Sequence, residues 1–276
     1  MSGGMGARDM MKWETAISKI VSGEDEEEVI IRGRKLSDLV GKVTFSEMMF
    51  LLIRGELPSK GQGRVLDALL VASMEHGISP PAMLSRCLAS YGSPIQAAIA
   101  AGVLVHGDVT GGAGEQFAKM LAEKVEMLNK KQRGISEESL RDAAKEIVEE
   151  ARRTGQRVAG YGIPLHKEDP RAPAILRIAQ EEGVFSTHCR FAKLLEEELG
   201  KSMGRRIPMN IDGVGGAILL DLGFSWQTAR IFIITPRTVA MGVHYLEELG
   251  QETKWRHIKQ DQVEYIPERP KASGGK

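Results

Sequence analysis

One carboxylate stands alone in the most apolar and glycine-rich stretch of the sequence, and a group in that setting can move protons. The stretch is residues 208–217, Pro-Met-Asn-Ile-Asp-Gly-Val-Gly-Gly-Ala, and Asp212 is its one ionisable side chain. A helix is expected to begin here and to continue through Leu220. Two interpretations follow. Asp212 is an acid/base group that faces a ligand, or it is the N-cap of the helix, where aspartate accepts backbone N–H bonds.

Glycine and histidine gather in two turns between expected helices. In residues 74–81, His76 closes a helix, and it serves either as a cap or as a ligand contact. Residues 105–115 include three glycines within four positions, which lets backbone N–H groups approach a ligand. This turn lacks the Gly-Lys-Ser/Thr ending of a P-loop, and the glycines after Asp212 follow no βαβ strand. Nucleotide hydrolysis and a Rossmann domain are therefore excluded.

A third turn collects cationic side chains. Residues 158–171 pair Gly-Tyr-Gly with Asp-Pro-Arg and bring His166, Lys167 and Arg171 close together in sequence. Such a loop suits an anionic ligand, since Arg171 can clamp a carboxylate with two parallel hydrogen bonds; the alternative is a solvated basic loop. Arg237 lies in an otherwise apolar helix, so it pairs either with a structural carboxylate or with an anionic substrate.

Composition excludes several classes of protein. The chain has 276 residues, 42% hydrophobic and 27% charged, which is typical of a soluble globular protein. Basic and acidic residues balance at 37 each, so no net charge attracts a nucleic acid. Cys87 and Cys189 lack zinc-like spacing and indicate buried thiols in a reducing compartment, and no metal site is expected. No apolar run reaches the roughly 18 residues of a membrane span, so we expect a cytoplasmic protein without a membrane partner.

The elements that position these residues are predicted to be helical. Residues 44–47 form a capping box, Thr-Phe-Ser-Glu, at the start of a helix that stops at Gly55. Residues 29–36 could form a short strand and turn, and the β-like run 231–235 is interpreted as buried helix because a helical pattern follows it. The fold class predicted is all-α. Further helices are expected at 61–76, 81–91, 94–106, 113–130, 136–153, 170–183, 186–199, 213–222 and 225–249.

Taken together and in this order, the motifs resemble the citrate synthase superfamily, and within it the short branch of citryl-CoA lyases related to the C-terminal part of ATP citrate lyase. The resemblance covers roughly residues 13–265. It depends on five motifs. The first runs from Arg32-Gly to the end of residues 51–58, and the second is Gly107-Asp-x-x-Gly-Gly-Ala113. The others are Gly160-Tyr-Gly with His-Lys-Glu-Asp-Pro-Arg171, Asn210-Ile-Asp-Gly213, and Arg237-Thr-x-x-x-Gly-x-x-His244.

This resemblance implies a citrate synthase-like helical fold of two domains. The large domain would be residues 1–111 plus 225–276, and residues 112–224 would form a small domain that bears the catalytic aspartate. Members are homodimers or larger homo-oligomers, and the cleft between their domains closes on a coenzyme A thioester and a 2-oxo acid. Closure excludes water and protects an enol intermediate. Coenzyme A is then substrate, and no covalently bound cofactor is expected.

The resemblance also implies roles for single residues. Asp212 would be the acid/base that moves the proton of the acetyl methyl carbon. His76, Arg171 and Arg237 would hold the polycarboxylate. The turn of Gly160, Tyr161 and Gly162, with Lys167 nearby, would bind coenzyme A.

Two positions depart from the family pattern. Thr110 stands where the family usually has a histidine that hydrogen-bonds the thioester oxygen, and Ile163 stands where a second histidine polarises the keto or hydroxyl oxygen. Losing such a group typically costs about 10²–10⁴-fold in rate. His106 lies four residues before Thr110, one turn away if the helix persists, and His166 lies three residues after Ile163, so either could substitute.

Three hypotheses remain. The first is a citryl-CoA lyase-like enzyme that cleaves a citryl-CoA-type thioester into an acyl-CoA and a 2-oxo acid. The second is condensation of the citrate synthase type with a divergent 2-oxo acid or acyl-CoA. The third is a non-catalytic paralogue that binds coenzyme A.

Overall fold

The computed structural model describes residues 12–23, 27–131, 134–162, 168–251 and 255–267. It is helical apart from a small N-terminal sheet, which confirms the all-α prediction. The chain divides into two compact units. Unit 1 comprises Met1–Glu75 and Gly107–Pro236, and unit 2 comprises His76–His106 and Arg237–Lys276. The domain division expected from the family concerns which parts move together on closure, and it stays a prediction.

Unit 1 begins with a three-stranded antiparallel sheet in the order β1 (Ser18–Ser22), β2 (Glu27–Ile31), β3 (Arg34–Lys35). The strand and turn predicted at 29–36 correspond to β2 and β3, with Arg32 in the left-handed region at φ 49°. The Arg32 guanidinium donates two hydrogen bonds, of 2.7 and 3.1 Å, to the Leu52 carbonyl and so ties the sheet to the next helix. The sequence did not predict β1 or the short helix α1 (Leu36–Leu39).

Capping boxes open the two helices that follow α1. In α2 (Phe45–Arg54) the Thr44 hydroxyl accepts the N–H of Glu47, and the Glu47 carboxylate accepts the N–H of Thr44. Gly55 ends this helix in the left-handed conformation, as predicted. A second box of Ser59 and Gln62 opens α3 (Lys60–Ser73).

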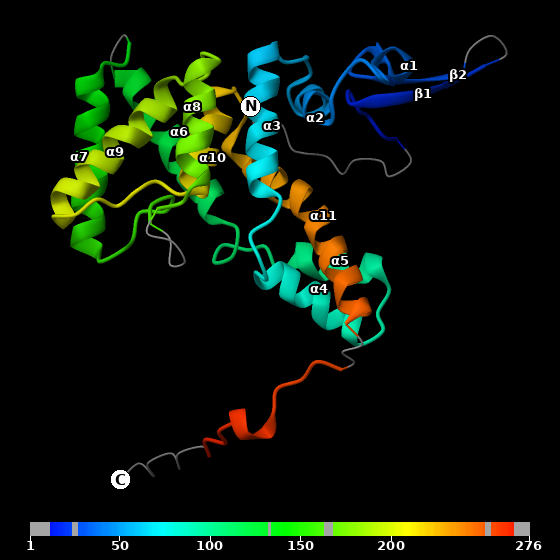
Figure 1. The fold of residues 1–276 in the computed structure, drawn as a ribbon. Coiled ribbons are helices and arrows are strands. Elements are labelled where there is room, and N and C mark those ends of the chain that lie inside the picture. The colour runs from blue at the N-terminus through cyan, green and yellow to red at the C-terminus, as the bar shows by residue number, and fades with distance from the viewer. Residues whose placement is uncertain (1–11, 24–26, 132–133, 163–167, 252–254, 268–276) are drawn as a thin grey trace, which may run out of the picture. The chain divides into compact units, whose positions relative to one another are not determined.

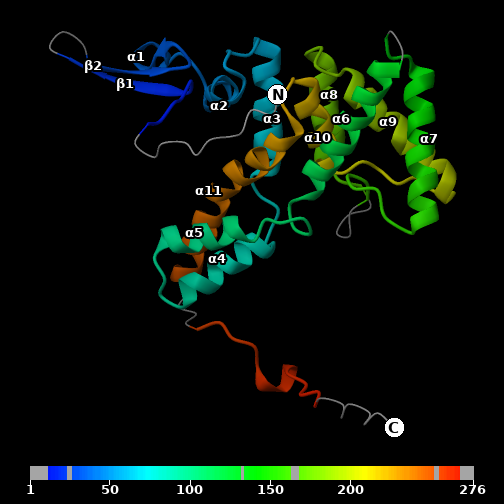
Figure 2. The same ribbon diagram turned by 180° about the vertical axis from the view of Figure 1, so that it is seen from behind.

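The rest of unit 1 packs around one buried helix, α10 (Ile211–Asp221). Its residues from Gly213 to Leu220 are all buried, because it is apolar on every side and such a helix must be surrounded. In Figures 1 and 2 it lies among α6, α8 and α9. The elements that contact α10 are α3, α6 (Ala113–Lys131), α8 (Arg171–Glu181), α9 (Thr187–Met203) and the 3₁₀ turn η1 (Trp226–Thr228). Helix α7 (Glu137–Thr154) packs against α9 and α6, and the first part of α11 (Ala229–Gly250) completes the unit.

Unit 2 is built from α4 (Pro80–Ser90), α5 (Ile95–Leu104) and the part of α11 that follows Pro236, with the 3₁₀ turn η2 (Gln260–Gln262) near the end of the chain. The Ser85 hydroxyl donates a 2.8 Å hydrogen bond to the carbonyl of Met241. Gly102 lets α5 approach the side chain of Met241 closely, since a Cβ at this position would lie 2.2 Å from the Met241 sulfur. The helices of unit 2 are therefore packed with little space between them.

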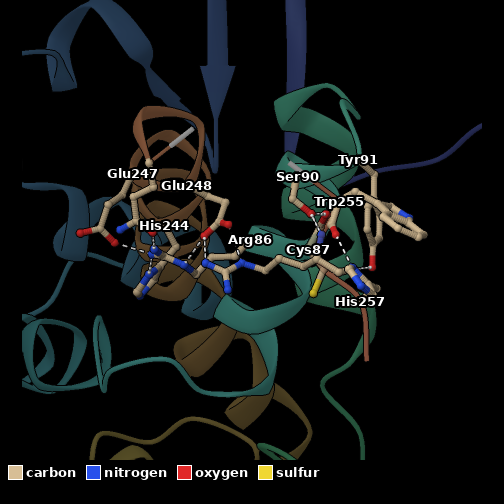
Figure 3. A network of polar contacts seen from close by, with 11 residues as sticks. Arg86, Cys87, Ser90, Tyr91, His244, Glu247, Glu248, Trp255 and His257 are labelled. Atoms are coloured by element: carbon tan, nitrogen blue, oxygen red, sulfur yellow. Dashed lines mark hydrogen bonds and ion pairs between the residues drawn. The ribbon is translucent and has the colours of Figure 1, made fainter. Parts of the chain in front are cut away.

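A buried ionic network joins α4 to the end of α11 (Figure 3). Arg86 donates from Nε to Glu248 at 2.8 Å, and its Nη1 lies 3.0 Å from Nδ1 of His244. Arg256 bonds the same Glu248 carboxylate from Nε and, at 2.9 Å, from Nη2. The Glu248 side chain is fully buried, so its charge needs partners, and the two guanidinium groups supply them. The network thus fixes Arg256, at the start of the C-terminal segment, to α4 and α11.

The run at 231–235 is helical, as predicted, and forms part of α11. Its burial is incomplete, because Phe232 is buried while Ile231 is 44% exposed. In the described residues no helix is long and apolar enough to cross a membrane.

Candidate active site

Asp212 is not the cap of its helix. The N-cap of α10 is Asn210, whose side-chain oxygen accepts the N–H of Asp212 at 3.0 Å and of Gly213 at 3.1 Å. Asp212 is the second residue of the helix, where the positive end of the helix dipole favours a carboxylate. The N-cap interpretation of Asp212 is therefore wrong, because the neighbouring Asn210 caps the helix.

The glycine-rich turn at 160–162 pairs with the residues that lead into α10. Asn210 donates its N–H to Gly160 at 3.0 Å and its side-chain amide to Gly162 at 2.7 Å, while the N–H of Gly162 donates to Pro208 at 2.8 Å. Gly213 packs directly on this turn, since a Cβ there would lie 2.3 Å from the Gly160 carbonyl oxygen. The turn predicted to bind coenzyme A and the helix that carries Asp212 thus form one rigid substructure.

The second glycine-rich turn also reaches Asp212. Gly114, in the first turn of α6, lies beside it: a Cβ at Gly114 would be 3.6 Å from the Asp212 Oδ1 atom. Gly111 and Asp212 line the same small cavity, of about 40 Å³, together with residues from α3 and α11. Thr110 precedes this wall, and its carbonyl accepts the Gly107 N–H at 2.9 Å. The carboxylate therefore borders a cavity walled by a glycine turn.

Arg230, which the sequence analysis did not single out, holds this turn in place. Its Nε donates to Glu115 at 2.8 Å, and its Nη2 bonds Asp108. These acceptors lie on either side of the glycine run, so the guanidinium spans the turn. Hydrogen bonds to both carboxylates raise the pKa of Arg230. The Gly-Asp motif at 107–108 was a signal, but its partner is more than a hundred residues away.

Arg171 begins α8 and is already bound to a carboxylate of its own chain. Its Nε and Nη2 donate to Asp169, each at 2.8 Å, and the Arg171 side chain is 16% exposed. Asp169 also accepts, at 3.0 Å, the N–H of Ile211, and Ile211 is the residue directly before Asp212. The structure thus brings Arg171 to the start of α10.

Tyr161 contributes its side chain to the core of unit 1. Its hydroxyl donates to the Ala192 carbonyl at 2.7 Å, its ring packs edge-on against Phe117, and burial raises the pKa of the phenol. The turn also borders a larger cavity of about 860 Å³ between the ends of α7 and α9. Its lining includes apolar residues and four arginines, namely Arg152, Arg157, Arg205 and Arg206.

The other predicted site residues fall in unit 2 or outside the described residues. His76 and Arg237 are half-buried in unit 2, and their meeting with Asp212 in one cleft stays a prediction. The helix predicted to carry His106 toward Thr110 ends at Leu104, so the two residues do not share a helical turn. His106 instead contacts the Gly102 carbonyl through Nδ1 at 3.0 Å. His166 and Lys167 lie outside the described residues, as does Ile163.

Comparison with known proteins assigns the class that the fold and the aspartate-bearing helix define. The family model for "Citrate synthase, C-terminal domain" matches residues 6–64 and 60–260, so this chain belongs to the citrate synthase family. Over 209 residues it is 28% identical to the glyoxysomal citrate synthase of Cucurbita maxima, a match that covers 71% of this chain and 37% of that protein. The chain therefore spans little more than a third of this relative.

Solved structures give a match along nearly the whole chain. The citryl-CoA lyase of Hydrogenobacter thermophilus is 32% identical, with a TM-score of 0.80 over 94% of this chain and 96% of that one. The ATP citrate lyase of Methanothrix soehngenii, solved with citrate and coenzyme A, has a TM-score of 0.78 at 19% identity, over 95% of this chain and 43% of that one. The latter likeness shows the fold alone.

Proposed function

We propose that this protein is a citryl-CoA lyase-like enzyme, which cleaves a citryl-CoA-type thioester into an acyl-CoA and a 2-oxo acid. The observation that carries the proposal is the placement of Asp212, a carboxylate in the second position of a buried apolar helix and at the border of a cavity. The 32% identity to a citryl-CoA lyase along nearly the full length of both chains supports the same reaction.

In this proposal Asp212 acts as the acid. A different group acts as the base and takes the proton of the substrate hydroxyl. The O–H electron pair becomes part of the new carbonyl. The carbon–carbon bond breaks, and its electron pair goes to the acyl-CoA enolate. Protonated Asp212 then gives its proton to the enolate carbon. His106 and His166 are the candidates for the base, Thr110 would donate a hydrogen bond to the thioester oxygen, and His76, Arg171 and Arg237 would hold the carboxylates.

The substrate's coenzyme A would occupy the 860 Å³ cavity beside Gly162. Its four arginines suit phosphate groups, and its apolar lining suits an adenine ring. Arg157 lies against Gly162, with a guanidinium nitrogen 3.7 Å from where a Cβ of Gly162 would stand. Lys167, which follows this turn in sequence, would add a further cation.

Calorimetry with coenzyme A tests that assignment. Arg157→Ala should weaken binding by about 10-fold, the effect of one lost charge-assisted hydrogen bond. Arg190→Ala, an exposed arginine on α9 that does not line the cavity, is the matched control and should leave affinity unchanged. Equal affinities for both variants would place coenzyme A elsewhere.

The reaction itself is tested by incubating the protein with citryl-CoA and related 3-hydroxyacyl-CoA thioesters and quantifying both products. We expect turnover that falls by about 10²–10⁴-fold in Asp212→Asn, because the amide cannot deliver the proton. Asp67→Asn changes an exposed aspartate on α3 and should retain full rate. No turnover with any thioester, or an unchanged rate in Asp212→Asn, would exclude the lyase.

Thr110 and Ile163 favour two alternatives, because they replace the usual histidines of the family. A non-catalytic coenzyme A-binding paralogue would show thermal stabilisation by coenzyme A with no product. A synthase would instead form product from a divergent 2-oxo acid or acyl-CoA, since an isoleucine in place of the histidine would make the pocket more apolar. The same incubations, run in both directions, distinguish these alternatives from the lyase.

We further propose that unit 2 forms a homodimer interface. Gln96 is the one polar side chain of α5, and Leu104 on this helix is 83% exposed. Val239, Val243 and Leu246 follow helical spacing along one face of α11 and are each more than half exposed. Light scattering should find a dimer in the wild type and in Lys60→Glu, and a monomer in Val243→Glu, because a charge on this apolar face opposes burial.

A further inference from the structure

Asp169 is a buried carboxylate whose two oxygens together accept four hydrogen bonds. Its Oδ1 accepts the backbone N–H of Arg171 at 3.1 Å and the Arg171 Nε at 2.8 Å. Its Oδ2 accepts the Arg171 Nη2 at 2.8 Å and the backbone N–H of Ile211 at 3.0 Å. The side chain is fully buried, so every bond it makes is to a fixed group of the protein. Such a carboxylate has few alternative positions.

The four bonds join two separate elements. Arg171 is the first residue of α8, and Ile211 is the first residue of α10, so one carboxylate fixes the starts of both helices. Asp212 follows Ile211 directly. A shift of Asp169 would therefore disturb both the Arg171 guanidinium and the first turn of α10.

The pair leaves Arg171 able to bind a second anion. A guanidinium has five N–H donors, and the fork to Asp169 uses one on Nε and one on Nη2. The Nη1 group is not part of the fork, and the side chain retains partial exposure. A substrate carboxylate could approach that edge while Asp169 holds the other.

The charge on Asp169 is maintained in spite of its burial. Burial raises the pKa of Asp169, but hydrogen bonds from the Arg171 side chain and from the Arg171 and Ile211 N–H groups outweigh it, and the pKa is lowered overall. The carboxylate therefore stays ionised near neutral pH and keeps its grip on the guanidinium.

We propose that Asp169 is a positioning residue, which sets the geometry between the substrate-binding guanidinium of Arg171 and the acid/base carboxylate of Asp212. This inference rests on the proposed function and extends it to a residue that touches neither substrate nor the reacting atoms. A displacement of about 1 Å between a binding group and an acid can cost about 10²-fold in rate. The ion pair is the element that prevents such a displacement.

The test compares two isosteric variants, one at the carboxylate that binds the first residue of α10 and one at the last residue of α10. Asp169→Asn removes the charge from the pair. Asp221→Asn removes the charge from an equally buried carboxylate at the last residue of α10, which bonds the start of α9. Both variants should lose thermal stability. We expect kcat/KM for citryl-CoA to fall about 100-fold in Asp169→Asn and to stay within about twofold of wild type in Asp221→Asn, when each is assayed well below its Tm.

A double-mutant cycle shows whether Asp169 acts through Arg171. Arg171→Ala and the double variant Asp169→Asn/Arg171→Ala should have the same kcat/KM within about twofold, because no guanidinium is left to position and the asparagine oxygen can still accept the Ile211 N–H. Independent, multiplicative losses would overturn the proposal. So would an Asp169→Asn protein with lowered Tm and unchanged kcat/KM, because its role would then be structural.

Calorimetry with citrate separates this inference from the proposed reaction. If the wild type turns over no thioester, the lyase proposal fails, but citrate affinity still reports on Arg171. Asp169→Asn should then weaken citrate binding by about 10-fold, while Asp221→Asn leaves it unchanged. A wild-type protein that does not bind citrate, or equal affinities in all three proteins, would overturn the positioning role.

Discussion

The two ends of α10 are each fixed by a buried aspartate, but the groups around the two carboxylates differ. At the N-terminal end, Asp169 binds the Arg171 guanidinium and one N–H of α10. At the C-terminal end, Asp221 accepts the backbone N–H groups of Ser186, His188 and Cys189 and contacts the His188 ring at 2.9 Å. One carboxylate holds a cation, and the other holds mainly backbone.

The difference distinguishes the end of α10 that carries the candidate site from the end that only supports the fold. Asp221 is the last residue of α10, where the negative end of the helix dipole disfavours a carboxylate, and its bonds to the start of α9 offset this cost. All of its partners belong to the framework. Asp212 lies at the favoured positive end, directly after the residue whose N–H binds Asp169, the partner of Arg171. In the proposed function, a single helix would therefore use one end for chemistry and the other for stability.

The largest expected effect is at the supporting end. Asp221→Ala should lower the free energy of unfolding by about 4 kcal/mol, since it leaves buried N–H groups of α9 without an acceptor. His188→Ala removes only the ring contact and should cost about 1 kcal/mol. Urea unfolding of both variants measures the two losses. Equal losses would mean that the ring, not the backbone, is the main partner.

At the site end, the close contact of α10 with the 160–162 turn gives the next prediction. Gly213→Ala should lower the free energy of unfolding by about 3 kcal/mol, because its Cβ would lie 2.3 Å from the Gly160 oxygen and 2.6 Å from the Met209 side chain. Gly215→Ala, two residues along the same helix, meets only Leu69 at 3.4 Å and should cost less than about 1 kcal/mol. A Gly213→Ala protein as stable as Gly215→Ala would contradict the packing.

The smallest effect concerns pH. Burial raises the pKa of Asp221, but hydrogen bonds from the His188 ring and from backbone N–H groups lower it overall. The pKa of Asp169 is likewise lowered overall by its hydrogen bonds with Arg171. A lowered native pKa gives stability that is present above the unfolded pKa of about 4 and is lost as pH falls through the native value. The stability difference between wild type and Asp169→Asn or Asp221→Asn should therefore shrink below about pH 4 in acid titrations of unfolding. A constant difference would show that neither charge matters.

Local signals predicted most of the fold. Helical spacing and terminal residues placed the helices within a few residues, and the capping box at 44–47 and the stop at Gly55 are confirmed. Strand β1 was missed because its Ser-Lys-Ile-Val-Ser sequence has too few apolar residues to indicate a strand by itself, and its pairing with β2 supplies the order.

The site was predictable only where one residue carried the signal. Asp212 stands out because no other ionisable group lies near it in sequence, but both Asn210 and Asp212 are good N-caps, and only the backbone decides between them. The fork of Arg171 to Asp169 depends on the geometry at the start of α8. Arg230 was missed because its partners come from a distant segment.

Cys189 makes one end of α10 accessible to measurement. The chain has two cysteines, and this one is fully buried and donates its N–H to Asp221, while burial raises the pKa of its thiol. A thiol reagent can reach the sulfur only when the start of α9 opens. The rate of its alkylation under native conditions, compared with that of the partly exposed Cys87, therefore reports how often the supporting end of the helix comes apart while the protein remains folded.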